Sequence, residues 1–297
     1  SCNLFPDSSY QHITFTMPDV LWHVFKDNRV SLNTLIKLAV GSLLRLAKKE
    51  GVTIGAFAAL HTHGRQMTWN THIHVSATMG GLDKHDKWKD IKFKKDSVMK
   101  MWRYAVIKMM RELVDNGYNN ITKDLLTAQY ERGWIVHFEK PTKDYKHTIA
   151  YIGRYTKKPP IAMSKIKHFD SHSVTFEFLN HRTKKYNRTT ITIEEFFDRF
   201  IQHIPEKFFK MTRYYGLFAT AVRGKTLPKL FKIFNQKIKD VTLTKFQQLS
   251  IFSFGYDPFK CILCGNQMVA STLVTGKRIS QLIDCHEQLA SRKRMPV

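Results

Sequence analysis

The 297-residue sequence is poor in acidic residues: 24 Asp and Glu stand against 48 Lys and Arg, giving a formal net charge of +24. A compact chain with this imbalance repels itself, so a polyanionic partner is expected. Nucleic acid is the usual partner of such a chain, and an anionic membrane surface is the alternative. The sequence has no apolar run of about 18 residues, which argues against a spanning helix. It also has no secretory signal at its N-terminus.

Cysteine is scarce as well, with four in the whole chain: Cys2, Cys261, Cys264 and Cys285. Without a signal peptide, this number argues against a disulfide framework. Cys261 and Cys264 form a Cys-x-x-Cys-Gly turn, which is half of a candidate structural zinc site. Cys285 and His286 are candidates for the other half, although adjacent ligands fit one tetrahedral centre poorly. The alternative is a tight turn with two structural thiols.

No internal repeat or low-complexity segment interrupts the pattern of elements. The alternation and helical spacing of apolar residues predict strands at 10–17, 52–61, 71–78 and 129–140, and helices at 31–51, 96–117 and 143–158. This β-α-β-β-α-β-α order is a split βαβ pattern with an antiparallel sheet, which defines an α+β fold. Beyond residue 165 the pattern changes to a hairpin of residues 173–180 and 187–195, followed by helices at 193–203, 228–239 and 243–249. We therefore expect a boundary near residue 165.

Two histidines stand one residue apart in TWNTHIHV, residues 68–75. Side chains alternate along a strand, so His72 and His74 point to the same face. Adjacent imidazoles repel one another when charged, and a shared divalent ion removes this repulsion by using both as neutral ligands. The preceding strand carries His61 and His63, and three convergent imidazoles form a metal site with open coordination positions. The alternative is a pair of surface histidines on an ordinary strand.

A second pair of reactive residues lies in YIGRY, where Tyr151 and Tyr155 are four residues apart and share one face of a helix. This helix directly follows the last strand, so its face is expected to meet the sheet that carries the histidines. The alternative is that the tyrosines only pack there. A phenol, with a pKa of about 10, is a poor nucleophile near neutral pH. A metal that polarises a phosphodiester makes its attack feasible. Arg154, Lys157 and Lys158 flank the pair and can neutralise phosphates.

Together these segments resemble a known family. A His-hydrophobe-His pair followed by a tyrosine helix is the hallmark of HUH endonucleases. The segments HTHGRQMTWNTHIHV, YIGRYTKKPPIA and FIQHIPEKFFKMTRYYGLFA resemble the two-tyrosine rolling-circle transposases of the IS-ninety-one-like group. The resemblance runs from YQHITFTMPD to CILCG. It implies an HUH nuclease core, with helices on the faces of a central antiparallel sheet, at 1–165. A smaller mixed α/β region for DNA binding or accessory roles would follow at 166–297.

The resemblance also implies the chemistry. Family members nick single-stranded DNA, form a 5′-phosphotyrosine, leave a free 3′-hydroxyl and use Mg²⁺ or Mn²⁺. His72 and His74 would then be metal ligands, and Tyr151 and Tyr155 the nucleophiles. In the family the preceding strand often reads Gln-Thr-x-Gly, and HTHG places His61 at the Gln position, which favours it over His63 as third ligand. Some relatives work with one tyrosine. Which of Tyr151 and Tyr155 attacks first, and whether both are needed, therefore stays open.

The resemblance implies single-stranded transposon-end DNA as the partner, in the bacterial cytoplasm and associated with the nucleoid. It implies no membrane partner, and it does not predict an oligomeric state. Family members usually begin with a cysteine-rich zinc region, which this sequence starts after or lacks.

Two other functions fit the same residues. A plasmid or phage replication initiator would use the same chemistry, and the order of histidines before tyrosines favours a transposase or an initiator over a conjugative relaxase. Initiators often carry a helicase domain, but in GLFATAVRGKT Ala219 stands where a Walker A loop needs its first glycine. A non-catalytic basic nucleic-acid-binding protein would use its histidines only for structural zinc.

Two basic segments are candidates for DNA contacts outside the site. Residues 82–95 interleave basic residues with Trp88 and Phe93, a composition suited to following a strand and stacking bases. Residues 180–188 form a basic hairpin tip in which Lys184 and Lys185 suit phosphate contacts. The alternative for both segments is an ordinary solvated loop.

Overall fold

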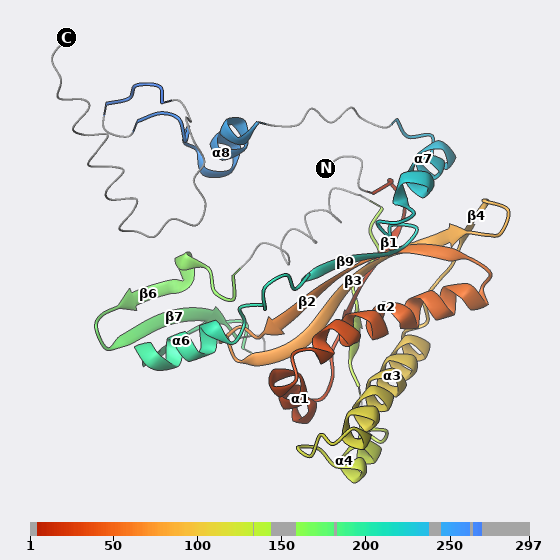
Figure 1. Cartoon of the computed structure of the whole chain (residues 1–297), viewed down its shortest axis with the longest axis horizontal. Helices are drawn as coiled ribbons and strands as arrows, with labels where there is room; N and C mark the ends of the chain where they lie inside the picture. Colours follow the sequence, from red (N-terminus) through yellow and green to blue (C-terminus); the bar gives the residue numbers. More distant parts are fainter. Residues whose placement is uncertain are drawn as a thin grey trace. The chain divides into compact units, whose positions relative to one another are not determined.

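A computed structural model describes residues 5–132, 134–143, 159–180, 183–237, 245–261 and 264–268 (Figure 1). The strands are β1 (Tyr10–Phe15), β2 (Thr53–His63), β3 (Trp69–Leu82), β4 (Trp88–Asp90), β5 (Val136–Phe138), β6 (Ile166–Phe169), β7 (Ser173–Leu179), β8 (Tyr186–Thr192) and β9 (Thr212–Gly216). The helices are α1 (Trp22–Asp27), α2 (Ser31–Lys49), α3 (Lys95–Asp115), α4 (Lys123–Ala128), α6 (Ile193–Ile201), α7 (Arg223–Ile233) and α8 (Phe246–Phe254). These elements confirm the predicted α+β class.

The main sheet is antiparallel throughout, in the order β5-β1-β3-β2-β9, with β4 paired to the end of β3. Alternation along β1 and β3 sends Ile13, Phe15, Ile73 and Val75 to one face, where all four are fully buried. The even-numbered residues of β1 and β3 point to the opposite face. The sheet therefore has one mainly apolar face and one face that carries histidine and threonine.

Helix α2 covers the apolar face because its own apolar residues recur every three or four positions. Leu35, Ile36, Ala39 and Leu43 are fully buried in the core cluster that includes the apolar face of the sheet. Burial of each large aliphatic side chain contributes roughly 1.5–3 kcal/mol relative to exposure. Helix α3 packs on α2, and α1 to α4 lie on the same side of the sheet (Figure 1). Gly51, with a φ of 78°, follows the C-terminal end of α2, as predicted.

A smaller aromatic cluster covers part of the opposite face. Tyr10 and Phe57 project from the sheet and pack with Phe5, Phe218 and Leu230, the last of which belongs to α7. Phe5 lies edge-on to Phe218, with ring centroids 5.1 Å apart. Helices thus contact both faces, as expected from the sequence. None of the helices in the described segments has the length and apolar character that crossing a bilayer requires.

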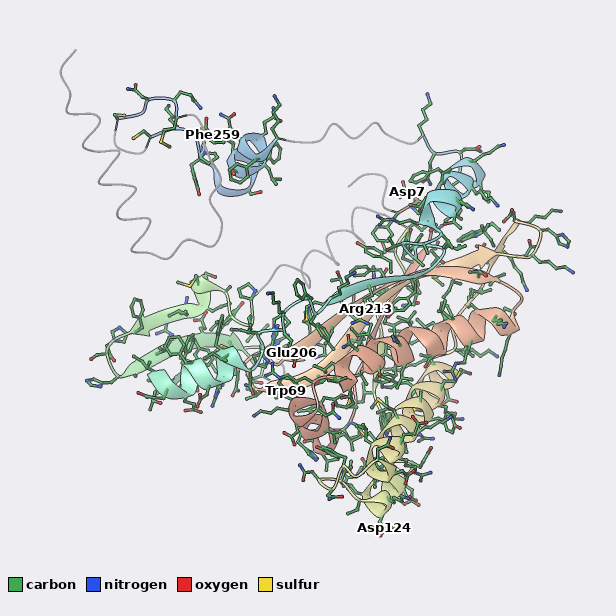
Figure 2. The ribbon with its side chains drawn as sticks, viewed as in Figure 1. Asp7, Trp69, Asp124, Glu206, Arg213 and Phe259 are labelled. Carbon is green, nitrogen blue, oxygen red and sulfur yellow. The ribbon has the colours of Figure 1, made fainter. Side chains whose placement is uncertain are left out.

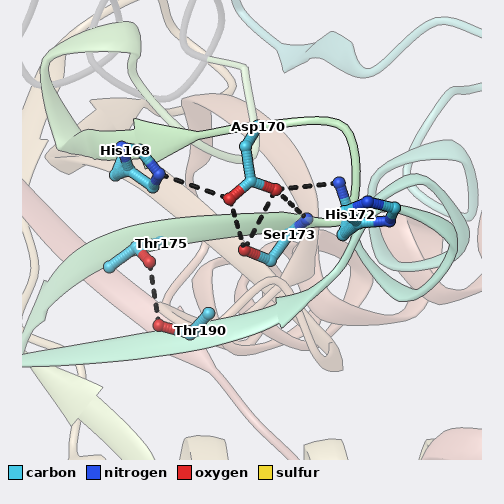
Figure 3. A network of polar contacts seen from close by, with 6 residues as sticks. All are labelled: His168, Asp170, His172, Ser173, Thr175 and Thr190. Carbon is cyan, nitrogen blue, oxygen red and sulfur yellow. Dashed lines mark hydrogen bonds and ion pairs between the residues drawn. The ribbon is translucent and has the colours of Figure 1, made fainter.

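A separate lobe is built from β6, β7, β8 and α6. Its three strands form an antiparallel sheet in chain order, and the β7–β8 hairpin is the one predicted from the sequence. The turn between β6 and β7 is closed by Asp170, whose carboxylate accepts from the backbone N–H groups of His172 and Ser173, both at 2.8 Å (Figure 3). These bonds lower the pKa of Asp170. Phe176 packs edge-on against Phe196 of α6.

Several predicted boundaries need correction. The strand predicted at 129–140 is reduced to β5, because Gln129 is buried at the end of α4 and accepts a bond from the Trp134 indole. The helix predicted at 228–239 begins earlier, at Arg223, and contains Pro228 in its interior. Strand β9 was not predicted at all. Most of the helix expected at 143–158 lies outside the described residues.

The division of the chain also differs from the expected boundary near residue 165. The structure separates into two compact units, Ser1–Lys239 and Asp240–Val297. Residue 166 does open the second sheet, but the chain then returns to the main sheet at β9, which pairs with β2 from Ala59↔Thr212 to Gly55↔Gly216. The lobe is therefore an insertion in the first unit.

Gly216 ends β9 in a conformation that only glycine tolerates there. Its φ is 58°, and a Cβ atom at this position would lie 1.9 Å from the carbonyl oxygen of Ile54. We expect Gly216→Ala to lower the free energy of unfolding by about 3 kcal/mol or more, measured by urea denaturation. Gly224→Ala in α7 is the matched control, because nothing lies within 4 Å of the methyl group that alanine would add there. Equal stability of the two variants would contradict this role of Gly216.

Candidate functional site

Three histidines converge on the polar face of the main sheet. His61 on β2 is directly opposite His72 on β3, and His74 lies two residues further along the same face of β3. One ligand nitrogen from each lies within 4.8 Å of the other two. In the described segments this is the one group of three or more His, Cys, Asp or Glu residues so arranged. The triad has the donor set that suits a divalent transition metal.

Hydrogen bonds at the rear of the rings orient two of the three histidines. Nδ1 of His72 lies 2.9 Å from the carbonyl oxygen of Asn70, and it must donate because a carbonyl can only accept. The neutral ring therefore presents an unprotonated Nε2. Nδ1 of His74 lies 3.1 Å from the hydroxyl of Thr14 on β1. Such bonds to the non-ligating nitrogen are typical of metal-binding histidines.

Burial keeps His72 and His74 neutral. It lowers the pKa of His72 to about 4. It also lowers the pKa of His74 to about 2, with smaller contributions of the same sign from the neighbouring imidazoles of His72, His61, His63 and His12. The rings crowd closely, with centroids 4.9 Å apart for His61 and His74 and 5.0 Å for His72 and His74. At neutral pH His72 and His74 are thus uncharged donor groups, the form that metals bind.

His63 stands beside the triad but outside it. A register shift in the β2–β3 ladder falls between His61 and His63, so the two residues do not continue the same pairing. The His63 ring stacks on His61 at 5.2 Å and approaches His203 at 5.6 Å. The geometry agrees with the preference for His61 as the third member of the group.

The turn that joins the two histidine strands is held by a residue that the sequence did not single out. His203, which follows α6, donates from Nε2 to the carbonyl of Met67 at 2.8 Å. Nδ1 is then left to accept from the hydroxyl of Thr62 at 3.0 Å. Its ring stacks on Trp69, and burial lowers its pKa to about 4, which keeps it neutral. Gln202 also donates to the Met67 carbonyl, at 3.1 Å.

Two further bonds join the lobe to the same turn. Arg199 of α6 donates to the carbonyl of Gln66 at 3.1 Å, and Arg65 of the turn donates to the carbonyl of Leu179 at 2.8 Å. Trp69 and Glu206 line one small cavity at this junction, and both are labelled in Figure 2. The lobe therefore braces the turn whose flanking strands carry the triad.

We expect His203→Ala to lower the free energy of unfolding by about 2–3 kcal/mol, because the buried Thr62 hydroxyl loses its partner, the Met67 carbonyl loses one of its two donors, and the ring packing on Trp69 is lost. Urea denaturation measures this loss. His203→Gln should lose less than half as much stability as His203→Ala, since an amide can also donate to Met67 and accept from Thr62. His172→Ala, on the exposed surface of the same lobe, is the matched control. A His203→Ala loss no larger than that of the control would contradict the bracing role.

The predicted nucleophiles and their basic neighbours are not among the described residues. Tyr151, Arg154, Tyr155, Lys157 and Lys158 all lie within residues 144–158, outside the described segments. Their assignments remain predictions.

The other candidate residues for DNA contacts lie on the surface of the first unit. Lys184 and Lys185 are exposed at the tip of the β7–β8 hairpin. Trp88 is half-buried: its ring packs on Phe234 with centroids 4.8 Å apart, and its indole donates to Asp90 at 2.7 Å. This packing gives Trp88 a structural role, whereas the two lysines are free to meet phosphates.

The Cys-x-x-Cys segment belongs to the second unit. The backbone N–H of Cys261 donates to the Asn266 carbonyl, and that of Gly265 donates to the Cys261 carbonyl at 2.8 Å. Cys264 is exposed. Cys285 and His286 lie outside the described residues, as does Cys2. The zinc site remains a prediction.

Comparison with known proteins places the chain in a class. It belongs to a family of transposases, enzymes that process DNA: residues 55–226, from β2 to the start of α7, match the sequence model of the family described as "Putative transposase". The chain is 36% identical over 293 residues to the transposase for insertion sequence element IS801 of Pseudomonas savastanoi pv. phaseolicola, covering 94% of this chain and 72% of that protein.

Two weaker similarities accompany this match. The chain is 24% identical over 243 residues to putative transposase y4qJ of Sinorhizobium fredii (strain NBRC 101917 / NGR234), over 74% of this chain and 61% of that protein. A solved conjugative relaxase, TrwC in complex with oriT DNA, aligns at 11% identity over 76% of this chain and 72% of its own. Its TM-score of 0.24 is too low to support any inference. The transposase family confirms the resemblance predicted from the sequence, and it makes DNA the partner.

Proposed function

We propose that this transposase nicks and rejoins single-stranded DNA at transposon ends through 5′-phosphotyrosine intermediates, as in rolling-circle transposition. The observation that carries the proposal is the convergence of His61, His72 and His74 within 4.8 Å on one sheet face of a chain that belongs to a transposase family. Membership of that family favours transposition over plasmid replication initiation, which would use the same chemistry.

His61, His72 and His74 would hold a divalent cation, Mg²⁺ or Mn²⁺. The neutral state of the His72 imidazole and its bond to the Asn70 carbonyl fit this role, because they leave a lone pair on Nε2 of His72. A cation bound there would polarise the scissile phosphate and stabilise charge on its oxygens. Three protein ligands leave coordination positions for those oxygens.

Tyr151 or Tyr155 would act as the nucleophile. The phenolic oxygen forms a bond to phosphorus and gives up its proton, while the bond from phosphorus to the 3′ oxygen breaks and that oxygen gains a proton. The products are a 5′-phosphotyrosine and a free 3′-hydroxyl. Rejoining reverses these changes with a 3′-hydroxyl as the nucleophile, so the bond energy is conserved. A second tyrosine would allow a second strand to be held during exchange.

The positive charge of the chain would supply most of the affinity for DNA. Lys184 and Lys185 at the hairpin tip are exposed, and Arg154, Lys157 and Lys158 would neutralise phosphates beside the nucleophiles. Because such binding releases counterions, it should weaken steeply as salt increases.

A single assay tests the proposal. The protein is incubated with labelled single-stranded transposon-end DNA and Mn²⁺, denatured, and separated by denaturing electrophoresis. The expected result is a labelled covalent complex and a free 3′-hydroxyl fragment, both absent in EDTA. Cleavage that persists in EDTA would contradict the metal role. Tight stoichiometric zinc with no covalent complex would instead support a non-catalytic binding protein.

A further inference from the structure

An exposed phenylalanine beside β9 has no structural explanation in the first unit. Phe208 is 87% exposed and has a φ of 66°. It is the third residue of a turn closed by a bond from the Phe209 N–H to the Glu206 carbonyl at 3.0 Å. Glycine or asparagine is preferred at a turn position with positive φ. Phe208 therefore bears both the backbone strain of this conformation and an aromatic ring in water.

The neighbouring residue shows that the core does not need this ring. Phe209 packs with Met211 against the main core cluster, on the side of the sheet covered by α2. The guanidinium of Arg213 lies 5.6 Å from the centre of the Phe209 ring and donates to the side chain of Asn33 on α2. Of two adjacent phenylalanines, one thus completes the core and the other points to solvent.

The surroundings of Phe208 are basic. Lys207 Nζ lies 5.1 Å from the centre of the Phe208 ring, and Lys210 is exposed on the other side of the turn. Both lysines and Phe208 line a shallow hollow together with Arg213. Glu206 also lines it and is the one acidic group among its lining residues. Three cations around an aromatic face complement a ligand that combines a π-system with negative charge.

The hollow lies at the β9 edge of the main sheet, next to β2, the strand that carries His61. The Met211 carbonyl accepts from the N–H of Leu60, the residue before His61, at 2.9 Å. Phe208 and Met211 are three positions apart in the chain, so their Cα atoms are at most about 11 Å apart. Arg213 and Glu206 are labelled in Figure 2, on the edge of the sheet formed by β9 and at the junction with the lobe.

We propose that Phe208 is a stacking platform for one unpaired nucleobase, with Lys207 and Lys210 contacting the adjoining phosphates. This inference rests on the proposed function, since it takes single-stranded DNA as the ligand. Every base has an aromatic face, so the subsite would bind without sequence preference. It would hold the strand at the β9 edge of the sheet that carries the triad.

The test measures binding of a labelled oligothymidylate by fluorescence anisotropy at several salt concentrations. Phe208→Ala is expected to weaken binding about 5- to 100-fold, the range seen for loss of one stacked base. The slope of log affinity against log salt should stay unchanged. Lys207→Ala with Lys210→Ala should instead reduce that slope by about one to two, as phosphate contacts do.

Two more variants make the result specific. Phe208→Tyr should bind within about threefold of the wild type, since it keeps the aromatic face, whereas Phe208→Leu should resemble Phe208→Ala. Phe197→Ala is the matched control, because Phe197 is 53% exposed on α6 but lies beside Asp198 and near Glu194. Thermal melting checks that each variant is folded.

The outcomes separate the two proposals. Unchanged binding by Phe208→Ala, or full binding by Phe208→Leu, would overturn the stacking role while leaving the covalent assay intact. Absence of a covalent complex from the wild type, together with Phe208-dependent binding, would overturn the strand-transfer chemistry and support the subsite.

Discussion

Replacing Tyr151 and Tyr155 together with phenylalanine is expected to abolish the covalent complex with single-stranded DNA. The proposed reaction needs a phenolic oxygen to attack phosphorus, and phenylalanine lacks this oxygen while keeping the ring. Loss of the nucleophile and its equivalent typically slows the chemical step by several orders of magnitude, so adduct yield should fall by about 10³-fold or more. Affinity for the same oligonucleotide should stay within about twofold, because the basic surface supplies it.

The single variants Tyr151→Phe and Tyr155→Phe distinguish the roles of the two tyrosines. If one phenol attacks first and the other holds a second strand, one single variant loses the first adduct and the other loses only rejoining. Arg132→Ala, an exposed basic residue in the turn before β5, serves as a charge control. A covalent complex that persists in the double variant would refute the assignment of the nucleophiles.

Much of the fold follows from periodicity alone. The helical spacing of Leu35, Ile36, Ala39 and Leu43 predicts α2, and all four are fully buried. Alternation predicts β1 and β3. Elements that lack such a pattern were missed: β9 is five residues long and half-buried throughout, so its position at the sheet edge comes from pairing with β2 and not from its own composition.

The site was predictable only where strand geometry determines it. His72 and His74 share a face because side chains alternate, and His61 meets them because hairpin strands are antiparallel. The preference for His61 over His63 as the third ligand came from the family resemblance. The register shift between His61 and His63 depends on the turn, and the conformation of that turn depends on partners far along the chain.

His203 illustrates that dependence. It is 141 residues from Thr62 and 136 from Met67, and no local pattern links them. Thr14 is similar: alternation put it on the polar face, but only the β1–β3 register places it beside His74. Long-range pairing decides which polar residues support the candidate metal ligands, and a single sequence carries no direct record of it.

Removing one proposed metal ligand at a time is expected to weaken both metal binding and formation of the covalent complex. We expect His72→Ala and His74→Ala each to weaken Mn²⁺ binding by about 100-fold or more, since even residues that only support a ligand cost 10–100-fold. The yield of covalent complex at low metal should fall in parallel. Mn²⁺ binding is measured by electron paramagnetic resonance of the free ion, and adduct yield by denaturing electrophoresis.

The same series tests the third ligand. His61→Ala should match the other two losses, whereas His63→Ala should weaken binding by less than about fivefold, because His63 lies outside the group of converging nitrogens. Bound metal should also stabilise the wild type, by about 2.7 kcal/mol at a metal concentration 100 times its dissociation constant. The three ligand variants should show little of this stabilisation, while His63→Ala should keep it. Metal affinity unchanged in His72→Ala and His74→Ala would show that the converging imidazoles do not hold the cation.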